Sequence, residues 1–137
     1  MLEKPVDGWS FIKIGSFQSR ISYLTNVPFD CLNACMSSLK YNLPVSIYFD
    51  TEGWEFTISS SYENTFIIVD DENGDTDLIT IQMNSTNFVK EIVHDIEYNL
   101  DEWSLWNISC DSMYEENKKN LAKLIDDLKS ILKEKYV

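Results

Sequence analysis

Residues 44–60 read PVSIYFDTEGWEFTISS and contain the pattern that decides the fold. Val45, Ile47 and Phe49 alternate with more polar residues, and the alternation resumes after a turn at residues 51–53. A period of two is typical of strands that bury one face and leave the other wetter. The stretch therefore predicts a β-hairpin, and the side chains that should face the core are Val45, Ile47, Phe49, Trp54, Phe56 and Ile58.

The sequence that follows extends this hairpin into a larger sheet. Residues 65–69 form a dense apolar run, which we interpret as a central strand covered on both faces. Asn73-Gly74 is a strong turn signal, and it leads into residues 77–83, where Ile79 and Ile81 share the core-facing side. Residues 44–83 are therefore predicted to form a four-strand antiparallel meander.

The flanking segments supply a second hairpin and three helices. Residues 9–14 and 20–24 read as short strands separated by Gly15-Ser16. One helix should begin near Pro28, a second should be capped by Ser85 or Thr86, and a third should begin near Ser112. The fold class is therefore α+β, with a curved antiparallel β-sheet (hairpin plus four-strand meander) packed with three helices, and residues 1–137 are expected to form a single domain.

Charge is distributed unevenly along the chain. The 137 residues include 11 basic and 23 acidic side chains, a net charge of −12. Residues 61–116 contain fourteen carboxylates and one lysine, whereas residues 117–137 contain six lysines and three acids. A chain of this charge repels phosphate backbones at long range, which argues against direct nucleic-acid binding.

The cysteines and the N-terminal residues bear on the compartment. Cys31, Cys35 and Cys110 are odd in number and form no disulfide framework, which is typical of a reducing environment. The first ten residues, MLEKPVDGWS, contain no apolar run of signal-peptide length, and the chain has no run long enough to cross a bilayer. We therefore expect a cytoplasmic protein that does not bind membranes.

Patterns that would indicate catalysis or metal binding are weak. His94 has no serine or cysteine placed beside it by a recognisable motif, so we interpret it as a surface or partly packed histidine. Cys31 and Cys35 are best explained as small apolar positions on a helix. The acidic turn at residues 70–77 resembles a calcium loop but has no glutamate at the required spacing. We expect no enzymatic activity, no cofactor and no metal.

Two acidic stretches are the candidate partner-binding residues. The first is the expected hairpin tip, and the second is the end of the second helix, where tryptophans combine rigid contact area with negative charge. We expect Trp106 to be core and Trp103 to contribute to binding. If both stretches lie on one edge of the domain, they form a single negative rim. The candidate residues are Asp70, Asp71, Glu72, Asp75, Asp77, Glu97, Asp101, Glu102 and Trp103.

With its acidic middle segment and the aromatic strands PVSIYFDTEGWEFTIS, the chain resembles the immunity proteins of contact-dependent growth inhibition and related bacterial polymorphic toxin systems. The resemblance implies a small cytoplasmic antitoxin that binds one cognate toxin domain. Such proteins commonly neutralise nuclease toxins by covering the basic surface that would hold RNA or DNA. The resemblance also implies that the partner is a cognate toxin protein, with a nuclease domain as the expected target. It further implies that the chain is a monomer or weak dimer.

One alternative function remains open. An acidic export chaperone of the type III secretion kind is also small, α+β and cytoplasmic, and it binds an extended effector segment on apolar patches, typically as a dimer. A small-molecule enzyme is a third class, and no residue pattern here argues for it.

Overall fold

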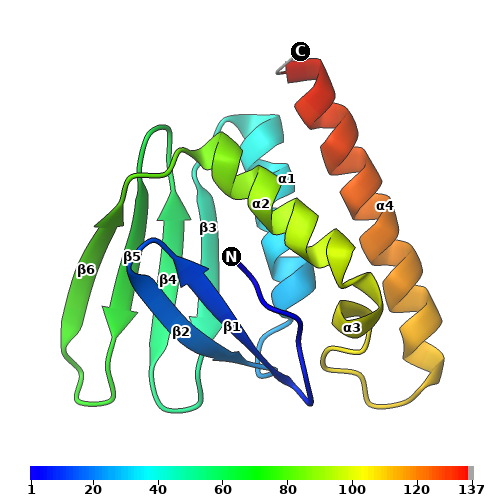
Figure 1. The fold of residues 1–137 in the computed structure, drawn as a ribbon, viewed down its shortest axis with the longest axis horizontal. Helices are drawn as coiled ribbons and strands as arrows, with labels where there is room; N and C mark the ends of the chain where they lie inside the picture. The colour runs from blue at the N-terminus through cyan, green and yellow to red at the C-terminus, as the bar shows by residue number, and fades with distance from the viewer. Residues whose placement is uncertain (136–137) are drawn as a thin grey trace.

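In the computed structural model, which describes residues 1–135, the largest element is a four-stranded antiparallel sheet (Figure 1). Its strands lie side by side in sequence order, so the predicted meander is confirmed. The strands are β3 (Val45–Asp50), β4 (Glu55–Ser60), β5 (Thr65–Asp70) and β6 (Thr76–Ile81). Because consecutive strands run in opposite directions, the β3–β4 and β5–β6 turns lie at the same end of the sheet (Figure 1).

Alternate side chains of the meander form its inner face. Ile47 lies opposite Ile58, and Ile58 lies opposite Ile67, so three buried side chains form one row across three strands. The Phe49 and Phe56 rings stack beside this row, with their centroids 4.9 Å apart. The predicted core-facing residues of β3 and β4 are buried, and three others pack partly buried against the same core: Trp54, Ile79 and Ile81.

The expectation that β5 is covered on both faces is wrong. Ile67 is buried on the inner face, whereas Ile68 on the outer face is 39% exposed. Thr57, its neighbour in register on β4, is also partly exposed. No part of residues 1–135 therefore covers the outer face of the sheet. A dense apolar run could not distinguish the two cases, because β-branched residues favour a strand whether one face or both are covered.

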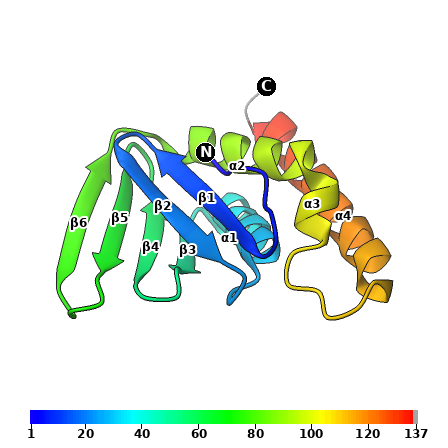
Figure 2. The same cartoon turned by 60° about the horizontal axis from the view of Figure 1, so that its bottom comes forward.

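The N-terminal hairpin lies across the inner face of the sheet (Figure 2). Its strands are β1 (Trp9–Ile14) and β2 (Phe17–Ser22). The turn of the hairpin packs against β6. Gly15 lies so close to the Ile81 side chain that a Cβ atom added to Gly15 would be 3.1 Å from it. Near the other end of β2, Arg20 Nε donates to the Thr51 carbonyl oxygen over 3.1 Å. The second strand begins earlier than the predicted residues 20–24, since Gly15, at φ +56°, reverses the chain immediately after β1.

Within residues 1–135, four helices complete the core on the side of β3 (Figures 1 and 2). They are α1 (Val27–Tyr41), α2 (Ser85–Tyr98), α3 (Leu100–Ser104) and α4 (Ser112–Lys135). Helix α1 packs on β3, and α4 packs on α1 and α3. The α+β architecture is as predicted, except that there is one helix more than expected.

The additional helix and one cap correct the sequence-based boundaries. Helix α2 ends at Tyr98, and the chain turns at Asn99 into the single turn of α3, which inserts Trp103 into the core. The N-cap of α2 is Asn84, whose side-chain oxygen accepts the Asn87 N–H over 2.8 Å, rather than Ser85 or Thr86. Asparagine is as good a cap as serine, so the cap position could not be chosen by residue type alone.

Candidate protein-binding surface

The two turns at the lower end of the sheet in Figure 1 bring together carboxylates that are distant in sequence. One group comes from β3, β4 and the turn between them, and the other from β5, β6 and their turn. An open groove between the turns is lined by five of these carboxylates and by Trp54. We call the whole set the acidic end, and it consists of Asp50, Glu52, Glu55, Asp70, Asp71, Glu72, Asp75 and Asp77.

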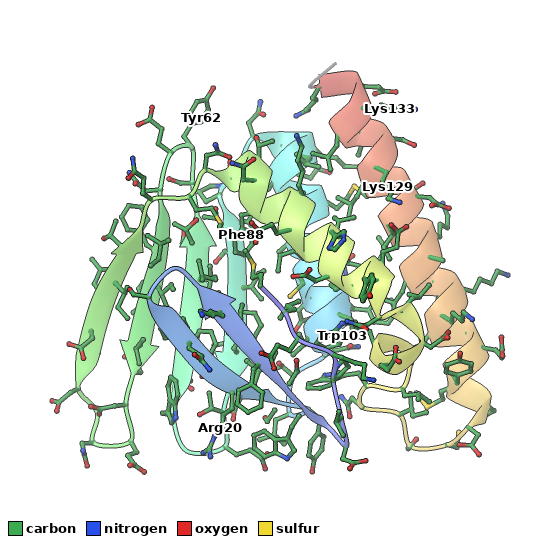
Figure 3. The ribbon with its side chains drawn as sticks, in the orientation of Figure 1. Arg20, Tyr62, Phe88, Trp103, Lys129 and Lys133 are labelled. Atoms are coloured by element: carbon green, nitrogen blue, oxygen red, sulfur yellow. The ribbon has the colours of Figure 1, made fainter. Side chains whose placement is uncertain are left out.

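No carboxylate of the acidic end forms an ion pair within residues 1–135. The nearest cation is Arg20, which Figure 3 places close to the β3–β4 turn. Its guanidinium donates to the Thr51 carbonyl of this turn and lies 5.6 Å from the Trp9 ring centroid, and it forms no ion pair with a carboxylate of the acidic end. The acidic end therefore presents eight carboxylates with Arg20 as a neighbouring cation, a large excess of negative charge.

Hydrogen bonds order the β5–β6 tip. Asp71 Oδ1 accepts from the backbone N–H groups of Asn73 and Asp75, over 2.8 and 2.9 Å. Asp70 Oδ1 accepts from the Thr76 hydroxyl over 2.7 Å. Gly74 adopts φ +82°, which a residue with a side chain rarely does. Asp70 and Asp71 thus hold the turn, whereas Glu72, Asp75 and Asp77 project into solvent with no hydrogen bond of this kind.

Tyr48 links the acidic end to the adjacent part of the outer face. Its hydroxyl donates to Glu55 Oε2 and lies 3.5 Å from Asp50 Oδ2. The hydrogen bond to the Glu55 carboxylate is the main cause that raises the pKa of Tyr48 to about 12. Tyr48 is therefore a neutral hydrogen-bond donor at physiological pH.

The second predicted acidic stretch is largely neutralised by α4. Glu97 pairs with Lys129 over 2.6 Å, and Asp101 pairs with Lys118 over 2.9 Å. The hydrogen bond from Lys118 lowers the pKa of Asp101, and the Tyr114 hydroxyl adds to this effect. These carboxylates therefore hold helices together. Their role in binding a partner stays a prediction, as does that of Glu102, which is partly buried.

The two predicted acidic stretches do not lie on one edge of the domain, which is the condition for a single negative rim. In Figures 1 and 2, α3 and the β5–β6 turn lie at opposite ends of the molecule, with the N-terminal hairpin between them. The physical reason is that α2 leads the chain away from the sheet edge at β6 toward α4. The two acidic stretches therefore form separate surfaces.

Trp103 is not available for surface contact, so its predicted binding role is also wrong. Its side chain, which is labelled in Figure 3, is 1% exposed. Its ring centroid lies 5.2 Å from that of Trp106. Trp106, which is buried as expected, donates its indole N–H to the Thr25 carbonyl over 3.0 Å. The aromatic residue beside exposed carboxylates is instead Trp54, which lines the acidic groove. The sequence feature that could have identified Trp54 is its position directly after the β3–β4 turn.

The remaining reactive side chains include His94 and three free cysteines. His94 is exposed on α2, where Nδ1 lies 3.1 Å from Asp95 Oδ1. Within residues 1–135 there is no group of three or more metal-ligating side chains of the His, Cys, Asp and Glu types placed to hold an ion. No helix in the same range is long and apolar enough to cross a membrane.

We expect Cys110 to be the only thiol that reacts with iodoacetamide in the folded protein. Cys110 is exposed, and a hydrogen bond with Ser112 lowers its pKa, so its thiolate fraction should rise at a lower pH than that of a free thiol. Burial raises the pKa values of Cys31 and Cys35. Mass spectrometry of the alkylated protein across pH measures this, and equal modification of all three thiols before unfolding would refute it.

Comparison with protein-family models, with curated proteins and with solved structures finds no match for this chain.

Proposed function

We propose that this chain is an immunity protein, which binds a cognate bacterial toxin domain through the acidic end and neutralises it. The observation that carries the proposal is the gathering of eight carboxylates at one end of the sheet with no ion-pair partner within residues 1–135. Concentrated charge of one sign attracts a partner of the opposite sign and speeds the encounter. A basic protein surface is therefore the partner that this chain suits best.

A nuclease domain is the basic partner that the proposal names. A nuclease must hold phosphates, so its active site presents lysine and arginine side chains. Carboxylates spaced along two neighbouring turns can pair with those lysine and arginine side chains in place of phosphates. Inhibition then follows from occlusion of the active site, with no chemistry performed by this chain. The resemblance to immunity proteins supports the same assignment, and with it a cytoplasmic location, where the toxin would act.

An export chaperone is the second candidate, and one observation favours it. Tyr48, Ile68 and Leu78 leave apolar surface exposed on the outer face of the sheet, and chaperones of this kind hold extended client segments on apolar patches. The two functions differ in what is bound. An immunity protein binds a folded toxin domain as a monomer or weak dimer, whereas a chaperone dimer binds a segment that is unfolded when free.

The test of the proposal is the salt dependence of complex formation. The probe is the C-terminal domain of the protein encoded immediately upstream of this chain, expressed without this chain and refolded from denaturant. We expect the association rate constant to fall steeply as salt rises, because ions screen charges beyond about 10 Å at 0.1 M. The dissociation rate constant should change little. Both are measured by surface plasmon resonance across ionic strength.

Two results would count against the proposal. An association rate constant that does not depend on salt would mean that the acidic end does not face the partner. Binding only of a denatured or truncated probe, together with a stable dimer of this chain in sedimentation, would favour the chaperone.

A further inference from the structure

The outer face of the four-stranded sheet carries a row of exposed apolar side chains. Tyr48, Thr57, Ile68 and Leu78 lie directly opposite one another across β3, β4, β5 and β6. Tyr48 is 43% exposed, Ile68 39% and Leu78 64%. Strands are about 4.8 Å apart, so the row spans about 14 Å, which is wide enough for a contact with another protein. We call this row the outer apolar row.

The outer apolar row is continuous with part of the acidic end. The next residues in register on the same face are Asp50, Glu55 and Asp70, which form a row of carboxylates. The Tyr48 hydroxyl joins the two rows through its hydrogen bond to Glu55. The outer face therefore presents an apolar strip with a negative border along one side, and Phe66 lies partly buried on the other side.

We infer that the outer face is the surface on which the toxin domain docks, with the outer apolar row as the anchor that holds the complex. This inference rests on the proposed function and adds the partner surface to it. The matching surface of the toxin domain is an apolar patch beside the basic site that the carboxylates cover. Apolar contacts desolvated at the centre of an interface mainly determine the dissociation rate, whereas charges at its rim mainly determine the association rate.

The charge on this face argues against a second copy of the chain as its occupant. Each copy has a net charge of −12. A symmetric pair joined through the outer face would bring two carboxylate rows into one interface, where like charges repel. With a basic partner, the same row of carboxylates attracts the lysine and arginine side chains that face it.

The variant Ile68→Thr/Leu78→Thr tests the inference. Threonine is β-branched, which strands favour, and it removes most of the apolar area of both side chains. The matched control is Leu43→Thr, which removes a comparably exposed apolar side chain from the loop between α1 and β3, at the end of the sheet away from the acidic end. The probe is again the refolded C-terminal domain encoded immediately upstream. We expect the double variant to dissociate about tenfold faster or more with an unchanged association rate constant, and the control to behave as the parent.

The outcomes separate the inference from the proposed function. If charge reversal at the acidic end weakens binding but the double threonine variant dissociates at the parental rate, the inference is overturned and the proposed function stands. If the parent does not bind the probe, both fail. Sedimentation of the chain alone supplies the last outcome: a dimer that the double variant dissociates would assign the face to self-association and overturn the inference.

Discussion

Replacement of Glu72, Asp75 and Asp77 by lysine is expected to weaken binding of the toxin domain by about tenfold or more and to leave the fold intact. A like charge placed against a basic site costs several kcal/mol, and each tenfold loss of affinity corresponds to about 1.4 kcal/mol. These three side chains are exposed, whereas Asp71 is kept because its carboxylate accepts the hydrogen bonds that hold the turn. Circular dichroism checks the fold, and titration calorimetry measures the affinity.

The matched control reverses three exposed carboxylates elsewhere and so changes the net charge equally. Glu91, Asp126 and Glu134 lie on α2 and α4, where lysine is a good helix former. The control should bind within about a factor of two or three of the parent, because long-range charge alone adds little once salt screens it. Equal weakening by both variants would mean that net charge, rather than the acidic end, governs binding.

Trp103→Ala is expected to have the largest effect on stability. Trp103 is buried against Trp106, and removing a buried tryptophan side chain costs about 3–5 kcal/mol. Domains of this size are stable by about 5–15 kcal/mol, so the variant should be close to unfolding. Urea unfolding followed by circular dichroism measures the loss.

A second variant at this position separates packing from hydrogen bonding. The Trp103 indole N–H is buried and has no hydrogen-bond partner within residues 1–135. Trp103→Phe keeps an aromatic ring and removes that donor, so it should cost clearly less than Trp103→Ala. An unfolding midpoint of Trp103→Ala equal to that of the parent would contradict the buried position.

The meander was predictable because its residues alternate with a period that only a strand satisfies. Ile47, Ile58 and Ile79 were placed on the core side without any knowledge of the layers. The exposure of Ile68 could not be predicted in this way, since it depends on where the hairpin and the helices pack. The sequence indicates that a residue favours a strand, but it does not indicate which elements cover that strand.

The acidic end was only partly predictable. The carboxylates of residues 70–77 are recognisable from the sequence as a hairpin tip, whereas Asp50, Glu52 and Glu55, which belong to the preceding hairpin, are not among the predicted binding residues. An antiparallel meander places alternate turns at one end, so the predicted topology already implied that the β3–β4 and β5–β6 turns lie at the same end of the sheet. Pairing of Glu97 with Lys129 and of Asp101 with Lys118 was not predictable, because it depends on how α4 packs against α2 and α3.

The most direct test is a titration with this chain of the C-terminal domain encoded immediately upstream, the proposed toxin domain, followed by the hydrolysis of RNA and DNA substrates. Nuclease activity should fall linearly to zero at one equivalent of the parent chain, whereas the Glu72→Lys/Asp75→Lys/Asp77→Lys variant should require a clear excess. Full nuclease activity in a large molar excess of the parent chain would contradict the central claim that this protein neutralises a toxin by covering its basic site.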